Sequence, residues 1–441
     1  MSNKFMPHTE EDIRAMLEKI GVQTIDDLYG DVPEEVIYRE EYDIPSAMSE
    51  IELRRHFKEL GDKNRQLTVF AGGGAYDHYS PSVIGHLLQR SEFYTAYTPY
   101  QPEISQGTLQ YIFEYQSIIA ELTGMEASNA SMYDGATATA EAMFMMVAST
   151  KKKNRVLISD TVSERVQAVV KTYGKFHGVA VTVVPEKDGV SDLDAIKKEL
   201  EAGDVAGIIV ATPNKYGIIE DYTGFADAVH AAKGLMTVNA DPSTLAVLRT
   251  PAEWGADIAC GDGQTLGMPL AFGGPYLGYM ATSKANLRKM PGRVVGATTD
   301  ADGKRAYVLT LQAREQHIRR EKATSNICSN QSLMALYATI YVALMGKEGL
   351  KEVNRLSCDG AHYLYNRLVE TGKFTPAFPG KPFLKEFVMK TDLDMKRVNA
   401  HLAENGVMGG LDLGEGLVEF AVTEKRTREE IDRLITLMLE A

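Results

Sequence analysis

The stretch "GIIVATPNKYGIIEDYTGFADAVHAAKGLMTVNAD", residues 207–241, decides the fold. It begins and ends with a short apolar run, at 207–214 and at 235–241, and a helical pattern at 225–234 separates the two runs. An apolar strand, an amphipathic helix and a second apolar strand in this order are typical of parallel strands buried on both faces. Asp241 closes the stretch, at the end where such sheets bind ligands.

The same alternation continues outward in both directions. Apolar runs with high strand propensity occur before the stretch at 155–160 and 179–185, and after it at 256–262 and 276–282. Helical patterns follow the first two runs, at 163–176 and 191–202. We therefore predict an α/β fold whose large, mostly parallel sheet has helices on both faces.

The flanking segments extend this domain on both sides. Residues 1–60 read as a helical arm that starts with a capping box at Thr9 and Asp12, and the arm either docks on a partner or caps the domain. The large α/β domain is expected at 61–325. A long apolar helix and a small C-terminal α/β domain, with Thr427 as the cap of its last helix, are expected at 326–441.

The composition limits the classes of function. A net charge of -13 over 441 residues argues against non-specific nucleic-acid binding. Cys260, Cys328 and Cys358 are widely spaced, as in proteins of a reducing cytoplasm. The N-terminus lacks a signal-peptide pattern, the longest apolar stretch (332–345) is shorter than the roughly 20 residues of a membrane span, and the nine histidines lack ligand spacing. We expect a cytoplasmic protein without a metal site or membrane span.

A stretch of small residues at 127–146 predicts an anion site. Its residues Asp134, Gly135, Ala136 and Thr137 would lie at the start of a helix, where free N–H groups and the helix dipole favour a phosphate. A small-residue cap that permits close packing is the alternative interpretation.

Asp241 and Gln264 together raise the question of a cofactor. In many pyridoxal-phosphate enzymes an aspartate at a strand end pairs with the pyridine nitrogen, although Asp241 before Pro242 is also typical of a turn. A lysine is expected roughly two dozen residues later, because only its amine forms the Schiff base. Residues 234–283 contain no lysine, and Gln264 lies in "GDGQTLGMPLAFGGP" (261–275), where the lysine is expected. The chain therefore lacks the residue that would anchor the cofactor.

Two loops carry many aromatic side chains. "FAGGGAYDHYSPSVI" (70–84) contains His78, and "EFYTAYTPYQPEISQG" (92–107) contains Tyr97, Tyr100 and Gln101. Such density indicates either the wall of a binding site or a rigid loop packed on a neighbouring domain.

These motifs, with "GADIACGDGQTLGMPLAFGGP" (255–275) and "REQHIRREKATSNIC" (314–328), resemble the P-protein family of the glycine cleavage system. Within it, the chain is similar to the first, or alpha, subunits of split glycine dehydrogenases (decarboxylating). The resemblance implies a fold-type-I pyridoxal-phosphate transferase of the aspartate aminotransferase kind. It also implies that a second, beta subunit bears the cofactor lysine, and that Gln264 marks a pseudo-site in this chain.

The resemblance further implies the reaction and its participants. Glycine is decarboxylated on pyridoxal phosphate, carbon dioxide leaves, and the aminomethyl group passes to the lipoyl arm of the H protein. The expected assembly is an alpha2beta2 heterotetramer. His78, Tyr97, Tyr100 and Gln101 are expected to complete the partner's active site, while Asp241 and residues 134–137 are relics of a cofactor pocket.

Two other functions remain open at this point. One is a free-standing pyridoxal-phosphate aminotransferase or lyase, which the missing lysine disfavours. The other is a structural or regulatory subunit that never contacts substrate, which the many polar and aromatic residues of the two loops disfavour.

Overall fold

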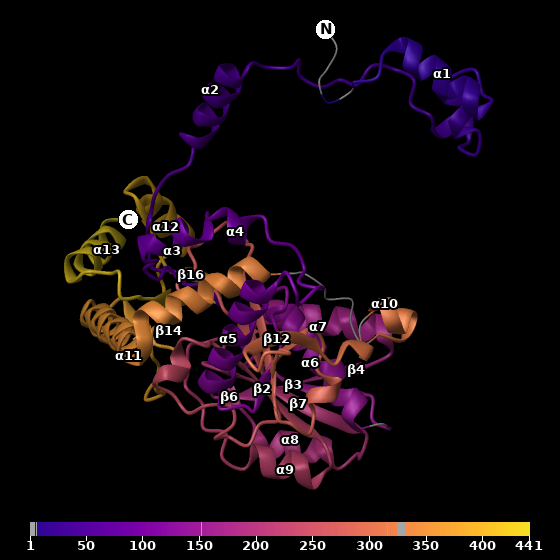
Figure 1. Ribbon diagram of the computed structural model, residues 1–441. Coiled ribbons are helices and arrows are strands. Elements are labelled where there is room, and N and C mark those ends of the chain that lie inside the picture. The colour runs from indigo at the N-terminus through magenta and orange to yellow at the C-terminus, as the bar shows by residue number, and fades with distance from the viewer. Residues whose placement is uncertain (1–4, 6, 151, 315, 324–330) are drawn as a thin grey trace. The chain divides into compact units, whose positions relative to one another are not determined.

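The predicted central sheet is present in the computed structural model, which describes residues 5, 7–150, 152–314, 316–323 and 331–441 (Figure 1). The strand order is β2-β10-β9-β8-β7-β3-β4. The five strands from β9 to β4 are parallel, whereas β10 is antiparallel to β9 and to β2. The bounds are β2 Ala127–Ser128, β3 Arg155–Ser159, β4 Ala180–Val184, β7 Val205–Thr212, β8 Leu235–Ala240, β9 Ile258–Asp262 and β10 Gly278–Thr282. The prediction of a mostly parallel sheet is confirmed.

Strand β7 shows why this sheet needs helices on both faces, because all eight of its residues are buried. Ile209 packs in one hydrophobic cluster with side chains of helices α6 (Gly135–Thr150) and α7 (Glu164–His177). Ile208 and Val210 point the other way and join a second cluster. Helices α5 (Gln106–Thr123), α8 (Leu193–Leu200), α9 (Phe225–Ala231) and α11 (Ser332–Glu370) contribute to that second cluster. Alternate residues of one strand thus supply two cores.

The C-terminal part of the chain forms a smaller α/β layer with its own core. Its antiparallel sheet has the order β13-β14-β17-β16 (Phe374–Pro376, Glu386–Thr391, Leu417–Ala421 and Leu411–Gly414). Helices α12 (Met395–Glu404) and α13 (Arg428–Glu440) pack on it, and the predicted cap by Thr427 is confirmed. A strand of two residues, β1 (Thr68–Val69), pairs with β15 (Val407–Met408), so the start of the large domain is joined to this layer. Two residues carry no readable periodicity, which is why this pairing was not predicted.

Several short elements complete residues 66–441. They are helices α3 (Ser82–Leu88), α4 (Ser91–Tyr94) and α10 (Gln316–Arg319), hairpins β5–β6 (Glu186–Lys187, Val190–Ser191) and β11–β12 (Val294–Thr299, Arg305–Thr310), and 3-10 turns η3 (Thr244–Ala246), η4 (Leu287–Lys289), η5 (Gln312–Arg314) and η6 (Arg320–Lys322).

Helix α11 is long enough and apolar enough to cross a membrane by length and composition alone. Its side chains Ala335, Tyr337 and Tyr341 are nevertheless buried in the cluster shared with the central sheet. We interpret α11 as a core helix, and it corresponds to the long apolar helix expected within 326–441.

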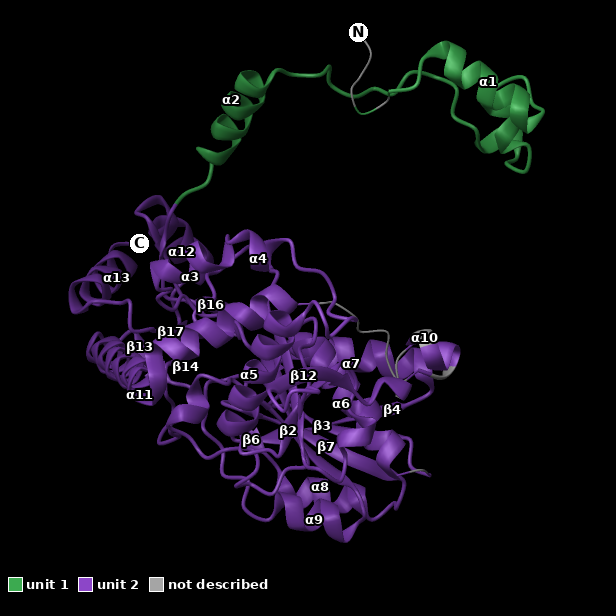
Figure 2. Ribbon diagram, in the orientation of Figure 1, with its two compact units in different colours: residues 1–65 green, residues 66–441 purple. Residues whose placement is uncertain are grey.

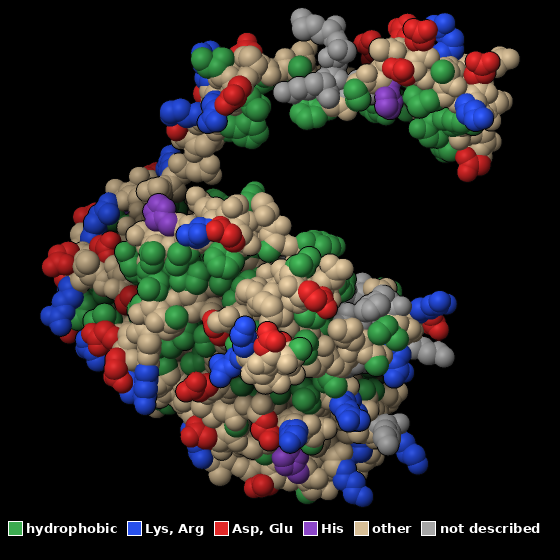
Figure 3. All heavy atoms as spheres, viewed as in Figure 1, with side chains coloured by type: hydrophobic (Ala, Val, Ile, Leu, Met, Phe, Trp, Pro, Cys, Tyr) green, Lys and Arg blue, Asp and Glu red, His purple; other side chains and the backbone are tan. Residues whose placement is uncertain are grey.

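Residues 1–65 form a separate unit (Figure 2). It contains α1 (Glu10–Ile20), α2 (Glu50–Gly61) and two 3-10 turns, η1 (Asp26–Tyr29) and η2 (Glu34–Val36). The predicted capping box of Thr9 and Asp12 is present, and Ser49 and Glu52 form a second one. None of the residues of α1 or α2 is buried, and Figure 3 shows hydrophobic side chains at the surface of this unit. Its helices are therefore held by local caps and not by a core of their own.

We predict that Gly207→Ala destabilises the chain by about 1–3 kcal/mol or more. A methyl group on Gly207 in β7 would meet the carbonyl oxygen of Leu235 and the sulfur of Met146, and backbone cannot move aside cheaply. The matched control is Gly85→Ala in helix α3, where a methyl group meets nothing within 4 Å. The control should be neutral or more stable by up to ~1 kcal/mol. Denaturant unfolding of the two variants measures both effects, and equal midpoints would contradict the prediction.

Candidate functional site

Gln264, at the predicted pseudo-site, lies in the turn that follows β9, and its side chain is buried. Its Oε1 accepts from the backbone N–H of Tyr76 at 2.9 Å. Its Nε2 donates to the carbonyl oxygens of Tyr76 at 2.8 Å and of Met268 at 2.7 Å. Both amide donors are thus used, and the side chain fastens the glycine-rich loop to the sheet instead of facing an open pocket.

Asp241 directly follows β8, at the strand end as expected, and both oxygens of its carboxylate accept hydrogen bonds. Oδ1 accepts from the N–H of Ser243 at 2.9 Å, from the Ser243 hydroxyl at 2.8 Å and from the Thr265 hydroxyl at 2.5 Å. Oδ2 accepts from Nζ of Lys385 at 2.6 Å. Burial opposes ionisation here, but the Lys385 charge and these hydrogen bonds outweigh it and hold the pKa of Asp241 below its usual range.

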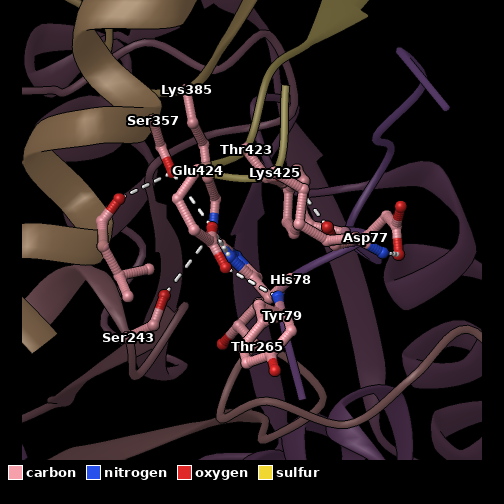
Figure 4. Close-up of polar contacts among 12 residues, drawn as sticks. Asp77, His78, Tyr79, Ser243, Thr265, Ser357, Lys385, Thr423, Glu424 and Lys425 are labelled. Carbon is pink, nitrogen blue, oxygen red and sulfur yellow. Dashed lines mark hydrogen bonds and ion pairs between the residues drawn. The ribbon is translucent and has the colours of Figure 1, made fainter. Parts of the chain in front are cut away.

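Lys385 is the buried partner of Asp241, and no motif in the sequence singles it out. Its side chain enters from the residue before β14 and is 2% exposed. Besides Asp241, the ammonium lies 3.1 Å from Nε2 of His78 (Figure 4). It also lies 4.0 Å from the ring centroid of Tyr76. Lysine is almost never fully buried unless it is paired, and the lysine that opens "KEFVMKT" shows no local sign of a partner more than a hundred residues away.

His78 belongs to this cluster. An ammonium can only donate, so Nε2 of His78 accepts from Lys385 and its Nδ1–H donates to Glu424 at 2.7 Å. Burial disfavours the ionised form of Glu424 and so raises its pKa. The contact with His78 and the N–H of Tyr79 outweigh this effect and hold the pKa of Glu424 below its usual range. His78 is buried, with both ring nitrogens engaged within this chain. A contribution of His78 to a partner's active site stays a prediction.

The glycine-rich loop is clamped by the C-terminal layer (Figure 4). Asp77 accepts from Nζ of Lys425 at 2.6 Å, and its carbonyl accepts from Thr423 at 2.8 Å. Glu386 accepts from the N–H of Gly73 at 2.7 Å and from the hydroxyl of Tyr76 at 2.8 Å. These contacts, together with Glu424, hold the loop in one conformation against the small sheet.

The predicted anion site at the start of α6 is filled by carboxylates of the chain itself. Oδ1 of Asp134 accepts from the N–H of Thr137 at 2.8 Å, and Ala136 is half-buried beside them. Oδ2 of Asp262 accepts from the N–H of Gly135 at 3.0 Å, and its Oδ1 accepts from the N–H of Gln264 at 2.9 Å. Burial raises the pKa of the Asp262 carboxyl to about 6.

The tyrosine loop presents a different kind of surface. The side chain of Tyr97 is 79% exposed, and Gln101 is exposed as well. Tyr100 is half-exposed and accepts from Nη2 of the buried Arg293 at 3.0 Å, with the guanidinium 4.9 Å from the ring centroid. The structure therefore brings Asp241, Gln264, His78 and the start of α6 into one internal network, and it leaves the tyrosine loop at the surface.

The described residues offer neither a reactive thiol at Cys260 nor a group of metal ligands. Burial raises the pKa of the Cys260 thiol to about 12, which leaves it protonated and unreactive. Cys358 is half-buried and free, and Cys328 lies outside the described residues. Within the described ranges, no group of three or more His, Cys, Asp or Glu side chains could hold a metal ion.

Comparison with known proteins gives one consistent result. Residues 3–438 match the family model of the glycine cleavage system P-protein. The chain is 52% identical over 440 residues to a protein of Moorella thermoacetica, and 50% identical over 444 residues to one of Anoxybacillus flavithermus. Both are named probable glycine dehydrogenase (decarboxylating) subunit 1, and each alignment covers at least 98% of both chains.

Solved structures agree. A crystal structure of glycine decarboxylase (P-protein) of the glycine cleavage system, in inhibitor-bound form, is 42% identical, with a TM-score of 0.90 over 100% of both chains. The glutamate decarboxylase of Lactobacillus brevis has a TM-score of 0.67 at 13% identity, over 92% of this chain and 96% of that one. The second likeness shows the fold alone. The expected fold-type-I architecture is confirmed.

Pyridoxal phosphate does not fit the residues of this network. Gln264 cannot form a Schiff base, both oxygens of Asp241 already accept hydrogen bonds from the chain itself, and the N–H of Gly135 is already bonded to a carboxylate.

We predict that Asp262→Asn changes how stability depends on pH. An acid with a raised pKa keeps its proton in the folded chain after the unfolded chain has lost it, so its contribution lowers the free energy of unfolding as pH rises from 4 to 6. The asparagine variant lacks this loss, so its free energy of unfolding relative to the wild type should rise by up to about 3 kcal/mol between pH 4 and pH 7. Urea unfolding at both pH values measures the difference. The exposed Asp302→Asn is the matched control, and parallel pH curves for Asp262→Asn and wild type would refute the expectation.

Proposed function

The chain belongs to the glycine cleavage system P-protein family, as a subunit of glycine dehydrogenase (decarboxylating), and we propose that it is the subunit that does not anchor the cofactor. The observation that carries the proposal is Gln264. At this position the cofactor enzymes of this fold need an amine, and an amide cannot condense with an aldehyde. The bonds of Gln264 to the backbone of Tyr76 and Met268 support a structural role for it.

In this proposal a second subunit binds pyridoxal phosphate through its own lysine. The name "subunit 1" of the relatives supports the existence of such a partner. Glycine loses its carboxylate as carbon dioxide, and the aminomethyl group passes to the lipoyl arm of the H protein. We further propose an alpha2beta2 heterotetramer in the cytoplasm.

This chain contributes to the shared site through its tyrosine loop. Tyr97 and Gln101 expose a hydroxyl and an amide that can donate to and accept from substrate, cofactor or the lipoyl arm. Arg293 holds Tyr100 by a hydrogen bond and by contact with the ring face, which keeps this part of the loop in place before the partner arrives. An exposed aromatic loop with a fixed base is suited to a protein interface, because tyrosine gives large contact area at a low cost in side-chain entropy.

Co-expression tests the division of labour. We expect the purified chain alone to be colourless with pyridoxal phosphate, to give no imine that borohydride can trap at residue 264, and to leave glycine unchanged. The chain together with its partner should decarboxylate glycine. If the chain alone turns yellow and splits glycine, the proposal fails. If the partner alone reaches the rate of the pair, this chain is a structural or regulatory subunit.

We predict that Tyr97→Ala slows glycine–bicarbonate exchange of the assembled enzyme by at least about tenfold, which corresponds to ~1.4 kcal/mol. The reason is the loss of an aromatic contact at the shared site, where Tyr97 is expected to help complete the partner's active site and position the substrate. The matched control is Phe176→Ala on α7, which also removes a largely exposed ring. Size-exclusion chromatography confirms that both variants assemble. Equal exchange rates in the two variants would remove Tyr97 from the site.

A further inference from the structure

Lys385 contacts Asp241, and Asp262 contacts the start of α6, which are the two places where the sequence predicts contacts to the pyridine nitrogen and the phosphate of a cofactor. We propose that Lys385 and Asp262 are internal substitutes for the pyridinium and the phosphate of pyridoxal phosphate, and that they exclude the cofactor from this subunit. The inference deepens the proposed function and rests on it for the origin of the pocket. It assigns the exclusion to two residues other than Gln264.

The contact between Lys385 and Asp241 resembles the contact between a pyridinium and an aspartate. A pyridinium N–H donates to an aspartate in the cofactor enzymes, and here Nζ of Lys385 donates to Oδ2 of Asp241 at 2.6 Å. The other oxygen of Asp241 already accepts three hydrogen bonds, from Ser243 and Thr265. A pyridinium would therefore have to compete with donors of the chain itself, above all with the Lys385 ammonium, for this carboxylate.

The space beside Asp241 is occupied by side chains of the chain itself. The Lys385 ammonium lies 4.0 Å from the ring centroid of Tyr76 and 3.1 Å from Nε2 of His78, so one aromatic ring and one ring nitrogen already occupy the space next to Asp241. Both rings are buried, and Tyr76 is fixed by Glu386 while His78 is fixed by Glu424. The cluster is closed by contacts from the C-terminal layer, and it cannot open without breaking several of them.

Carboxylates occupy the start of α6, where a phosphate would bind. A helix N-terminus binds phosphate through its free N–H groups. At the start of α6 the carboxylate of Asp262 accepts from Gly135, and that of Asp134 accepts from Thr137. Asp262 also accepts from the N–H of Gln264, so the one carboxylate links the helix start to the pseudo-site turn. A phosphate would have to displace an internal anion that is already bonded.

The variant Gln264→Lys separates the effect of Lys385 and Asp262 from the effect of the missing lysine. If Gln264 alone excluded the cofactor, Gln264→Lys would restore a Schiff base. If Lys385 and Asp262 exclude it, the lysine variant forms no Schiff base with pyridoxal phosphate until both charged side chains are also replaced.

Binding of pyridoxamine 5′-phosphate to the full-length chain tests the exclusion directly, because this amine form of the cofactor cannot form an imine with any lysine. We expect no change in the thermal midpoint of the wild type and a rise of several degrees in K385A/D262N, as ligand binding to the folded state requires. The additional change Asp241→Asn should abolish the rise, because an amide lacks the negative charge that stabilises the protonated pyridine nitrogen. A wild type that binds as tightly as the double variant, a folded double variant that does not bind, or binding that ignores Asp241→Asn would overturn the inference.

The single variant Gln264→Lys keeps the test decisive if K385A/D262N does not fold. Treated with pyridoxal phosphate and borohydride, it should carry no adduct at residue 264, as shown by mass spectrometry of the peptide. A stoichiometric adduct there would overturn the inference. Both tests use the isolated chain and no turnover, so their failure leaves the co-expression result, and with it the proposed function, standing.

Discussion

The ion pair between Lys385 and Asp241 is the interaction on which the rest of this structure depends. It joins the residue before β14 in the small sheet to the carboxyl end of β8 in the large one, at 2.6 Å and away from water. A buried charge without its partner is far more costly than an exposed one, so each of the two residues requires the other. The pair therefore fixes the small sheet against the edge where sheets of this type bind their ligands.

The same pair explains why the glycine-rich loop is ordered. Gly73, Tyr76 and His78 would have few partners if the small sheet moved away, because Glu386 and Glu424 come from that sheet or from the residues just after it. Gln264 supplies the remaining contact, from the large sheet. A pocket that needs to open for a cofactor could not tolerate so many internal bonds. In a subunit that contacts a partner only through its surface, the same internal bonds can keep the loop rigid.

A large share of the architecture was predictable because strand and helix periodicity is local. The runs at 155–160, 207–214 and 235–241 became β3, β7 and β8, since each is apolar on both faces and bounded by turn residues. The short strands β1 and β15 were missed because a pairing of two residues depends on segments more than 300 residues apart. Of the site, Asp241 and Gln264 were found from their distance along the chain and from the absent lysine. Lys385 and Asp262 were not, because nothing around them in the sequence marks a buried charge.

The amino-acid sequence by itself determined the class of fold, its two layers of helices around a mostly parallel sheet, and the absence of an amine at the pseudo-site. These properties follow from residue periodicity and side-chain chemistry, and both can be read from short stretches of neighbouring residues. Only the tertiary structure decided that Lys385 fills the place beside Asp241 and that Asp262 occupies the start of α6. Charge pairing in a protein interior depends on distance in space, and the fold brings together residues that the chain separates by more than a hundred positions.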